Sequence, residues 1–592
     1  MKIALIGNGG REHALAWKLA QSPRVKKIYA FGDNPGIGKL AEIYPINTDD
    51  FKALAAFLKK EKVDITLVGP EAPLVNGIVD YLSGQGLKVF GPQKAAAMLE
   101  GSKAFSKEIM LEAGVPTAAY REFNAALPAL AYIRQQNSFP AVIKADGLAA
   151  GKGVAIAGDL KEAEAFLEDV FDKKVFGDAG SRVIVEEFMQ GEEVSIFAVT
   201  DGKTVRYLSP AQDHKQIFEG DQGPNTGGMG TYAPTALISD ELLADIDERI
   251  IKPIFETLRR RGIEYRGVLF AGLMMTQEGP KVLEFNCRFG DPETQVLMPL
   301  LETDLALILE KTVKQELHEL EIELSSKKAV CFVAAAGGYP GDYKKGTPIH
   351  GLDKVKTTLF YAGVKEENKL FLTNGGRVLG VVALGKSIEE AREKALYELE
   401  KVSFEGMQVR KDIGIKEVKR PKVAVMMGSD SDLPVVAEGL KILEILEIPF
   451  EVHVLSAHRS PEELLPMAKG WKYKDLQIVI AAAGMAAHLP GVLAGHVDIP
   501  VIGIPIESKL QGLDALYSIV QMPAGVPVAT VTLGKSGAKN AALLAAKILA
   551  LKYPLIAKNL KNYQSKEKTA ALEKEKLLQE IGYRAYLESK KL

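Results

Sequence analysis

Apolar runs rich in β-branched residues alternate with helical patterns along the whole chain. In the first 100 residues, KIALIG and KIYAFG flank a helix expected from Glu12 to about Gln21, and DITLVG and LKVFG follow. This alternation predicts an α/β protein with largely parallel sheets, since a helix must return the chain between parallel strands. A chain of 592 residues is also too long for a single hydrophobic core, which predicts several domains.

Breaks in this pattern divide the chain into four expected domains, at 1–100, 101–326, 327–418 and 422–592. The main boundary lies near Lys419 to Lys422, where the charged stretch VRKDIGIKEVKRPK gives way to a new strand, VAVMMGSDSD. The last segment should be a compact three-layer domain. Its lysine- and glutamate-rich tail, from about Tyr553, should be a solvated helix or an oligomer arm.

The charge balance and the cysteines argue against several classes of protein. A formal net charge of -2 disfavours binding to nucleic acid or anionic membranes, which would need a basic excess. Cys287 and Cys331 form no C-x-x-C pair, so a disulfide framework is poorly supported and a reducing compartment fits. The uncharged stretch 476–497 should form a strand, a turn and a helix and not a membrane span. The opening MKIALIGNGG lacks the apolar region of a signal peptide, so we expect a cytoplasmic protein.

Two glycine motifs suggest nucleotide binding, and we retain one of them. GNGGREH follows a strand and opens a helix, where backbone N–H groups and the helix dipole favour a phosphate. Glu12 stands where the dinucleotide fingerprint needs its third glycine, so a phosphoribosyl substrate fits better than NAD. The stretch 380–387, GVVALGKS, satisfies the P-loop pattern, but its four middle residues are apolar and should continue a strand.

Cations and carboxylates in the middle of the chain predict a better nucleotide site. Lys103 and Lys144 could meet phosphates, and the glycine-rich stretch 147–153 should form a hairpin-like flap over a triphosphate. Glu284 and Asn286 lie two apart on an expected strand, so both point the same way and offer oxygen ligands for Mg²⁺. The preceding strand, GVLFAGLMM, offers no acidic ligand, which leaves the number of metal ions open. Acidic residues also surround a strand end in VEEFMQGEE, namely Glu186, Glu187, Glu192 and Glu193.

This ordered set resembles the ATP-grasp fold and, more specifically, the phosphoribosylamine–glycine ligase family. The resemblance extends over residues 1 to about 418 through GNGGREHALAWKLA, VGPEAPLV, LEGSKAFSK, IKADGLAAGKGV, GPNTGGMG, EFNCRFGDPETQ, AAGGYPGDY and TNGGRVL. It implies an N-terminal Rossmann-like domain, two ATP-grasp subdomains and a small C-terminal α/β domain. The implied reaction joins glycine to phosphoribosylamine, with cleavage of ATP to ADP and phosphate in the presence of Mg²⁺ or Mn²⁺.

The resemblance also assigns roles to residues of this sequence. Lys103 and Lys144 would hold phosphates, Arg288 would steady an acyl phosphate of glycine, and Glu284 with Asn286 would bind the metal. Adenosine would contact the run 186–189 and residue 193, that is Glu186, Glu187, Phe188, Met189 and Glu193. Phosphoribosylamine would contact Gly9, Gly10, Glu71, Asp213, His214 and Lys215.

Beyond Val423, small and polar residues gather where strands are expected to end. These places are Ser429 with Asp432, Ser456 to Arg459, Gly484 to His488, and Gln521 to Gly525. Such strand ends bind ligands in doubly wound sheets. Ser429 and Arg459 could clamp a phosphate and a ribose, and His458 is the natural acid–base residue because imidazole titrates near neutral pH. The histidines 458, 488 and 496 lack partners at ligand spacing, so zinc is the weaker alternative.

This second half, from about Val423 to Tyr553, resembles the 5-(carboxyamino)imidazole ribonucleotide mutase family through SAHR and AGMAAHLPG. The resemblance implies a flavodoxin-like domain that needs no cofactor and moves a carboxylate from the exocyclic nitrogen to carbon 4 of the imidazole. Its site would contain Ser429, Asp432, Ser456, His458, Arg459, Gly484 and His488. The family's octamers, with the small-residue helix AKNAALLAAKILA, imply a homo-octameric bifunctional enzyme of purine biosynthesis. Two alternatives stay open, a CO₂-dependent aminoimidazole ribonucleotide carboxylase and a non-catalytic oligomerisation module.

Overall fold

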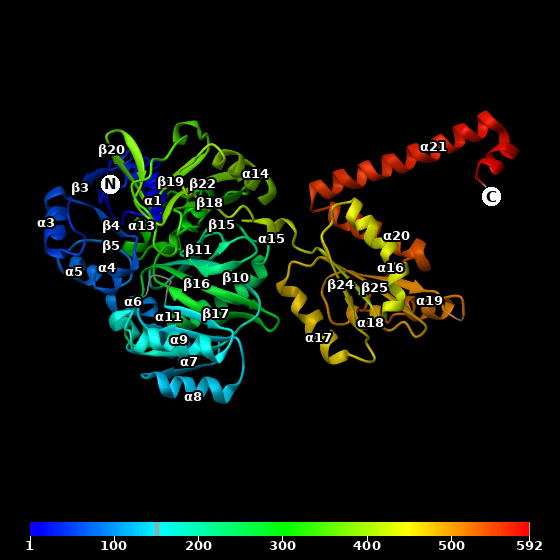
Figure 1. The fold of residues 1–592 in the computed structure, drawn as a ribbon, viewed down its shortest axis with the longest axis horizontal. Coiled ribbons are helices and arrows are strands. Elements are labelled where there is room, and N and C mark those ends of the chain that lie inside the picture. Colours follow the sequence, from blue (N-terminus) through cyan, green and yellow to red (C-terminus); the bar gives the residue numbers. More distant parts are fainter. Residues whose placement is uncertain (149–152, 509, 591–592) are drawn as a thin grey trace. The chain divides into compact units, whose positions relative to one another are not determined.

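The computed structural model describes residues 1–148, 153–508 and 510–590 (Figure 1). The chain divides into two compact units. The first consists of Met1–Thr276 and Pro280–Val418, and the second of Gln277–Gly279 and Lys419–Leu592. Across the described residues, no helix combines the length and the apolar character needed to cross a membrane.

A five-stranded parallel sheet begins the first unit, in the order β3-β2-β1-β4-β5. Its strands are β1 (Lys2–Ile6), β2 (Lys27–Phe31), β3 (Glu42–Tyr44), β4 (Ile65–Val68) and β5 (Val89–Phe90). The helices between and after them are α1 (Gly10–Leu19), α2 (Pro35–Gly38), α3 (Phe51–Glu61), α4 (Glu71–Val75), α5 (Ile78–Gly84) and α6 (Lys94–Gly101). The predicted Rossmann-like arrangement is confirmed, and the glycine turn lies between β1 and α1.

Two antiparallel four-stranded sheets follow, ordered β6-β9-β7-β8 and β11-β10-β16-β17. The first contains β6 (Tyr120–Phe123), β7 (Ala141–Ala145), β8 (Val154–Ala157) and β9 (Val183–Glu187), with α7 (Lys103–Glu112), α8 (Ala126–Gln136) and α9 (Leu160–Phe171). The second contains β10 (Glu192–Thr200), β11 (Val205–Tyr207), β16 (Gly267–Thr276) and β17 (Gly279–Asn286), with α10 (Asp240–Ile246) and α11 (Lys252–Arg260). The expectation of largely parallel sheets is wrong here, because strands joined by short turns, such as β16 and β17, run antiparallel. The predicted flap corresponds to the β7–β8 hairpin, and its stretch 149–152 lies outside the described residues.

A five-stranded antiparallel sheet, β12-β15-β18-β22-β19, completes the first unit. It contains β12 (Gln212–Asp213), β15 (Gly230–Ala233), β18 (Lys328–Ala335), β19 (Thr358–Tyr361) and β22 (Arg377–Gly385). Two small hairpins pair β13 (Gln216–Phe218) with β14 (Gln222–Asn225), and β20 (Val364–Glu367) with β21 (Leu370–Thr373). The helices are α12 (Thr294–Leu300), α13 (Leu305–Lys314), α14 (Ile388–Leu399) and α15 (Ile415–Val418). The P-loop pattern at 380–387 begins inside the buried strand β22, as predicted.

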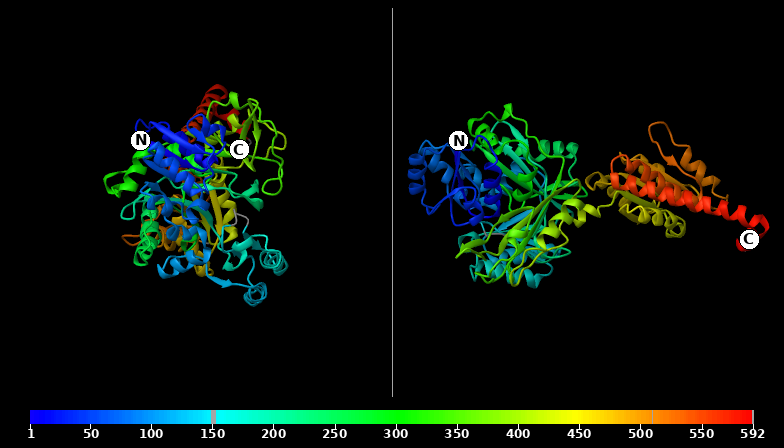
Figure 2. Two further views of the ribbon diagram at one scale, coloured as in Figure 1. Left: turned by 90° about the vertical axis from the view of Figure 1, so that its left-hand side faces the viewer. Right: turned by 90° about the horizontal axis from the view of Figure 1, so that it is seen from above.

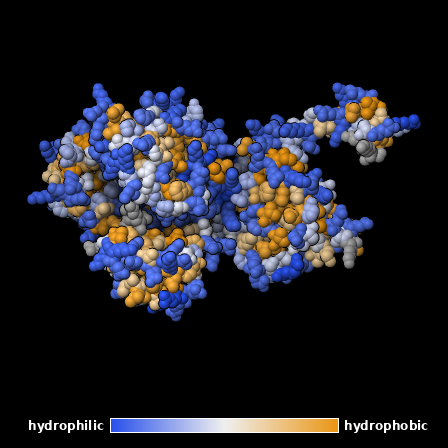
Figure 3. Space-filling model, in the orientation of Figure 1, coloured by the Kyte–Doolittle hydropathy of each residue, from blue (hydrophilic) through white to orange (hydrophobic). Residues whose placement is uncertain are grey.

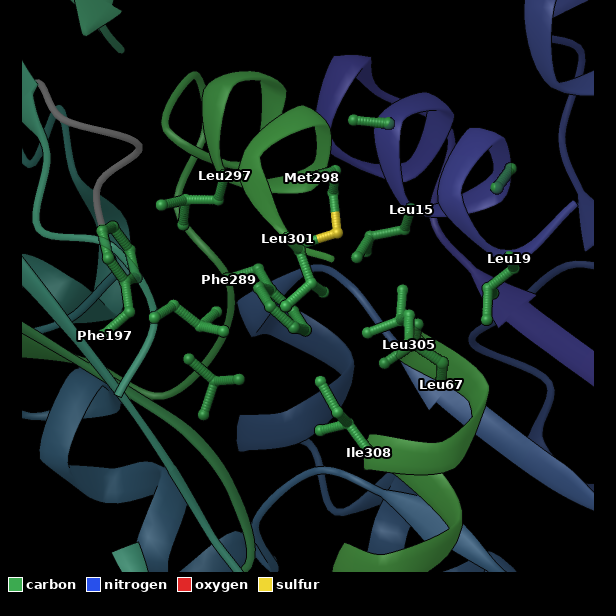
Figure 4. Packing of buried hydrophobic residues seen from close by; sticks show 14 of the residues in the cluster. Leu15, Leu19, Leu67, Phe197, Phe289, Leu297, Met298, Leu301, Leu305 and Ile308 are labelled. Atoms are coloured by element: carbon green, nitrogen blue, oxygen red, sulfur yellow. The ribbon is translucent and has the colours of Figure 1, made fainter. Parts of the chain in front are cut away.

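The main core of the first unit lies where α1, α12 and α13 meet the first sheet. Apolar side chains from these three helices, together with Leu67 and Phe289, point toward one another (Figure 4). This packing fixes the segment around Phe289, which connects β17 with α12, against the N-terminal sheet.

The second unit is a three-layer sandwich around the parallel sheet β24-β23-β25-β26-β27 (Figure 1). Its strands are β23 (Val423–Met427), β24 (Phe450–Val454), β25 (Ile478–Gly484), β26 (Val501–Ile506) and β27 (Ala529–Thr530). The helices are α16 (Leu433–Ile445), α17 (Pro461–Gly470), α18 (Leu489–Ala494), α19 (Leu513–Val520), α20 (Gly534–Ala550) and α21 (Pro554–Lys590). The strand order confirms the flavodoxin-like prediction, and β25 and α18 confirm the reading of 476–497.

One expectation for this unit is wrong. Gln521–Gly525 follows the helix α19 and not a strand, because the strand that precedes it, β26, ends at Ile506. The small-residue face of α20 is buried within the same unit, where Ala538, Ala541 and Ala545 pack in the core that α16 also lines. The tail is helical as predicted, and α21 extends away from the sheet (Figure 2).

Candidate active sites

One cavity of about 520 Å³ in the first unit collects most of the residues predicted for a nucleotide site. The predicted residues that line it are Glu71, Lys103, Lys144, Glu186, Glu187, Phe188, Met189, Glu193, Asp213, Lys215, Glu284, Asn286 and Arg288. Within the described part of the chain, Gly9, Gly10 and His214 are not among its lining residues. The cavity therefore combines several cations, several carboxylates and an apolar part.

A buried carboxylate between two lysines forms one wall of the cavity. Glu186 lies 2.8 Å from the Lys144 Nζ and 3.2 Å from the Lys107 Nζ, and all three side chains are less than a tenth exposed. Burial lowers the pKa of Lys107 to about 8, although Glu186 raises it. Lys107 was missed in the sequence because a lysine in a helix is usually a solvated surface residue, and only its burial sets it apart. Glu186 thus holds two lysines and does not point freely at a ligand.

The next residues of the same strand end supply the apolar part of the cavity. Met189 is buried and Phe188 is partly exposed, and both line the cavity with Val142, Ile156 and Leu283. Apolar side chains beside backbone N–H and C=O groups suit a purine base, which offers both a ring face and a polar edge.

Lys215 connects two of the predicted carboxylates. Its Nζ lies 2.8 Å from Glu193 and 3.9 Å from Glu284. Burial opposes the charge of Lys215, but Glu193 and Glu284 raise its pKa above the ordinary value. Burial would likewise raise the pKa of Glu284, yet Lys215 and Lys144 hold it below its ordinary value. Both groups are therefore charged at neutral pH.

Glu284 and Asn286 lie at the end of β17 and line the same cavity. Among the described residues, no group of three or more His, Cys, Asp or Glu side chains comes together as a metal cluster. An ionised carboxylate and an amide oxygen do fit Mg²⁺, which keeps few protein ligands and completes its shell with phosphate oxygens and water. Lys103, whose Nζ donates to the Gly147 carbonyl at 3.0 Å, lies in the same cavity.

The glycine turn after β1 is hydrogen-bonded to a side chain of the helix that follows it, α1. The Gly9 N–H donates to Glu12 Oε2 at 2.7 Å, so this amide is occupied by the residue that replaces the third glycine of the dinucleotide motif. Arg11, which the sequence reading did not select, is buried and lines the cavity, and it donates to the Phe289 carbonyl at 3.2 Å. Arg11 from the glycine turn therefore lines the cavity, as do Glu71 of α4 and Glu100 of α6.

The loop 213–215 divides between the cavity and the core. Asp213 and Lys215 line the cavity, whereas the His214 ring is buried and packs against Tyr232 at 6.0 Å between ring centroids. Burial and the charge of Arg410 lower the pKa of His214 to about 4. Burial also raises the pKa of Asp213, and the charge of Glu293 adds to this effect.

The strand ends of the second unit bring the predicted histidines together. His458 Nε2 and His488 Nδ1 are 2.7 Å apart, and both rings are exposed. The Ser456 hydroxyl accepts from the backbone N–H groups of His458 and Arg459, both at 3.3 Å. Arg459 donates to the Gly428 carbonyl at 3.0 Å, which brings it to the end of β23 beside Ser429.

This arrangement places one imidazole where the other can fix its tautomer. Only one of the two facing nitrogens can carry the shared proton, so each ring determines which nitrogen of its neighbour is free. Ser429 begins a short turn at Asp430–Asp432, and burial raises the pKa of Asp432. Gly484 ends β25 directly before the segment that carries His488.

Comparison with known proteins agrees with this division of the chain. The family models for the phosphoribosylglycinamide synthetase N domain, ATP-grasp (A) domain and C domain match residues 1–100, 101–294 and 329–416. The AIR carboxylase family model matches residues 422–570. A phosphoribosylamine–glycine ligase from Caldanaerobacter subterraneus subsp. tengcongensis is 52% identical over 414 residues, which covers 70% of this chain and 99% of the relative. The Escherichia coli K12 protein of the same name is 46% identical over 427 residues, covering 71% and 99%.

Solved structures show the same likeness. The crystal structure of a phosphoribosylamine–glycine ligase from Thermotoga maritima superposes with a TM-score of 0.62 at 33% identity, covering 70% of this chain and all of that one. The biotin carboxylase domain of a Hydrogenobacter thermophilus 2-oxoglutarate carboxylase, solved with MgADP, has a TM-score of 0.54 at 15% identity over 69% of this chain and 91% of that one. At that identity the second likeness concerns the fold alone.

Proposed function

The chain belongs to the phosphoribosylamine–glycine ligase family, and its residues 422–570 match the AIR carboxylase family. We therefore propose that it is a cytoplasmic bifunctional enzyme of purine biosynthesis. The first unit joins glycine to 5-phosphoribosylamine at the expense of ATP. The second unit rearranges 5-(carboxyamino)imidazole ribonucleotide to 4-carboxy-5-aminoimidazole ribonucleotide. The observation that supports the first activity best is the convergence of Lys144, Lys215, Arg288 and the pair Glu284 and Asn286 on one cavity.

In the proposed ligation, the glycine carboxylate takes the terminal phosphoryl group of ATP to give an acyl phosphate and ADP. The amine of phosphoribosylamine then attacks the acyl carbon, phosphate leaves, and the nitrogen loses a proton. Lys103 and Lys144 neutralise phosphate charge, and Arg288 steadies the acyl phosphate. No covalent bond to the protein is needed, so the residues act by positioning and by charge stabilisation.

The remaining contacts follow the walls of the cavity. The base lies against Phe188 and Met189 and meets the backbone of the run 187–189, and Glu193 takes the ribose. Glu186 acts indirectly, because Lys107 and Lys144 occupy its carboxylate. Glu284 and Asn286 would hold Mg²⁺, or Mn²⁺ in its place, and the bound ion would further neutralise phosphate charge. Phosphoribosylamine occupies the side of the cavity near Glu71, Asp213 and Lys215.

Replacement of Glu284 by alanine tests the ligase assignment. We expect kcat for ADP release in the presence of glycine and phosphoribosylamine to fall about a hundredfold or more, because charge stabilisation in the transition state is lost. Glu321→Ala is a suitable control, since Glu321 is 83% exposed and pairs with Arg206 outside the cavity. A Glu284→Ala chain that keeps nearly normal kcat would contradict the metal assignment.

The contact between His458 and His488 supports the second activity. In the proposed rearrangement, the carboxylate leaves the exocyclic nitrogen as CO₂ and is recaptured at carbon 4 of the ring. His458 protonates the departing nitrogen and later accepts the proton displaced from the carbon. Ser429 and Arg459 hold the phosphate and ribose, with Asp432, Ser456 and Gly484 shaping the site. This reaction requires neither ATP nor a metal ion.

Substitution of His458 by asparagine separates the two activities. We expect His458→Asn to abolish the rearrangement and to leave the ligase rate unchanged, because the imidazole that moves the proton is lost. His496→Asn is the matched control, because this ring is exposed and its Nδ1 lies 2.8 Å from the Val492 carbonyl oxygen of the preceding helix, α18. Loss of the rearrangement in EDTA would contradict the metal-free assignment and favour the zinc alternative.

The substrate distinguishes the proposed mutase from the alternatives. A mutase consumes carboxyaminoimidazole ribonucleotide directly, whereas a carboxylase of the same family consumes aminoimidazole ribonucleotide with CO₂. A purely structural module would turn over neither compound. Each outcome is read from the formation of 4-carboxy-5-aminoimidazole ribonucleotide by the intact chain.

The second unit also supports assembly into a homo-octamer. Apolar side chains gather on the face of this unit that Figure 3 shows. The exposed apolar residues near the strand ends include Met485, Leu510, Leu513, Tyr517 and Val520. Apolar patches of this kind mark protein contacts, and closed symmetry is the usual arrangement of identical chains. The alanine face of α20 contributes nothing to this proposal, because it is buried inside the unit.

A further inference from the structure

Glu100, near the end of α6, has both carboxylate oxygens engaged by the segment that follows β17. Its Oε2 accepts from the Cys287 N–H at 2.7 Å, and its Oε1 lies 2.9 Å from Arg288 Nη2. The side chain is 7% exposed. One carboxylate thus bridges the backbone of one residue and the guanidinium of the next, directly after Asn286.

Arg288 is held from several sides. Its Nε lies 3.3 Å from Glu71 Oε2, its Nη2 donates to Asn286 Oδ1 at 3.2 Å, and its Nη1 donates to the Phe289 carbonyl at 3.3 Å. Glu71 is 33% exposed and faces the cavity, so it can also meet a ligand. Glu100 differs from Glu71 because both of its carboxylate oxygens already meet protein donors, the Cys287 N–H and the Arg288 guanidinium.

Burial raises the pKa of Glu100 above its ordinary value, whereas the charge of Arg288 works against this. Two N–H donors meet the two oxygens, and only the ionised carboxylate accepts well at both atoms. We therefore describe the contact between Glu100 and Arg288 as a buried ion pair.

We propose that Glu100 is a positioning residue for Arg288 and fixes the direction in which the guanidinium enters the cavity. This proposal rests on the ligase function proposed above, in which Arg288 steadies the acyl phosphate. A free arginine side chain samples many rotamers. The two bonds of Glu100 fix both the backbone from which Arg288 projects and one edge of its guanidinium. Because misplacement of a reacting group by about 1 Å costs on the order of a hundredfold in rate, loss of this anchor should slow the chemistry.

Glu100→Gln tests the role of the anchor in the intact chain. Glutamine keeps an acceptor for the Cys287 N–H but removes the negative charge and turns an N–H₂ group toward Arg288. We expect kcat of the ligase to fall about 10- to 100-fold, the usual effect of changing a supporting contact around an active site. The KM for ATP should stay within about twofold, since the base and ribose contacts lie elsewhere in the cavity.

The same substitution on an Arg288→Lys background shows whether Glu100 acts through Arg288. If it does, Glu100→Gln should change kcat by less than about twofold once Arg288 is lysine, because residues that act as one unit are non-additive. An equal loss of kcat in both backgrounds would overturn the proposal. So would an unchanged kcat in the single variant.

A matched control separates positioning from stability. Glu398 of α14 also bridges a backbone N–H, that of Lys356 at 2.6 Å, and a cation, Lys401 at 2.5 Å, but does not line the cavity. Glu398→Gln should lower Tm and leave kcat unchanged. Should Glu100→Gln fail to fold, Glu100→Asp keeps the charge but is too short for both bonds, and the same cycle applies to it. If the protein without substitutions shows no ligase activity, the proposed function itself is overturned. If it is active but the effects of Glu100→Gln and Arg288→Lys on kcat are additive, only the positioning role is overturned.

Discussion

Acidification should destabilise the first unit through His13, which belongs to the glycine motif after β1. The residue is 7% exposed, and its Nδ1 accepts the Tyr361 N–H at 2.8 Å. Its ring packs edge-on against Phe360, with 5.5 Å between the ring centroids. This geometry requires the neutral ring with the proton on Nε2. Burial, with a smaller effect from Lys39, accordingly lowers the pKa of His13 from 6.5 to about 4.

The sign of the effect follows from proton binding. Between pH 6.5 and 4 the unfolded chain binds a proton at His13 and the folded chain does not, so stability is lost as the pH falls through this range. The full difference corresponds to about 3 kcal/mol, of which about 2 kcal/mol is lost between pH 7 and pH 5. His214, whose pKa burial also lowers to about 4, adds a loss of the same sign.

The assay is guanidinium unfolding of the intact chain at pH 7 and pH 5. The chain has two tryptophans, Trp17 and Trp471, so in a Trp471→Phe background the fluorescence of Trp17 reports on the first unit. His13→Asn keeps an acceptor near the position of Nδ1 but cannot be protonated. We expect His13→Asn to reduce the loss of unfolding free energy between the two pH values by about 2 kcal/mol. The control His318→Asn, at a side chain that is 65% exposed, should leave this loss unchanged. An equal loss in His13→Asn and in the unsubstituted protein would show that His13 does not cause the pH dependence.

Two further predictions concern the second unit. A Cβ on Gly439 of α16 would lie 2.6 Å from the Ala538 carbonyl oxygen of α20. Gly439→Ala should therefore lower the unfolding free energy of the second unit by about 1–3 kcal/mol, as measured by Trp471 fluorescence in a Trp17→Phe background. An unaltered unfolding midpoint would contradict this close packing. If the chain forms an octamer, light scattering of the intact protein should give a mass of eight times the 64.1 kDa of one chain. A monomer that still carries out the second reaction would contradict it.

Much of the fold can be predicted from the sequence where local pattern and topology coincide. The parallel sheets at both ends of the chain alternate with helices, and runs such as KIALIG and VAVMM indicate their strands. The antiparallel sheets in the middle are not distinguished by composition, because a short turn such as the one between β16 and β17 decides their direction. The small residues of α20 show close packing, but not whether the partner is another chain or, as observed, the same unit.

The candidate sites show a similar limit. Glu284, Asn286 and Lys144 were found because their neighbours in the sequence carry recognisable motifs, and they line one cavity. Lys107 could not be recognised from the sequence because Glu186, the carboxylate it pairs with in the interior, is far away in the sequence. The sequence also does not show that His214 points away from the cavity, which Asp213 and Lys215 on either side of it line. Side-chain direction in an irregular loop depends on tertiary packing.

One chain should carry two separate activities, and product analysis of the unsubstituted protein shows whether it does. Purified protein is incubated with glycine, phosphoribosylamine and Mg-ATP, and separately with carboxyaminoimidazole ribonucleotide in EDTA without ATP. We expect glycinamide ribonucleotide with one ADP per product in the first reaction, and 4-carboxy-5-aminoimidazole ribonucleotide in the second. Absence of glycinamide ribonucleotide would contradict the ligase function, and absence of the carboxylated imidazole in the second reaction would contradict the mutase function.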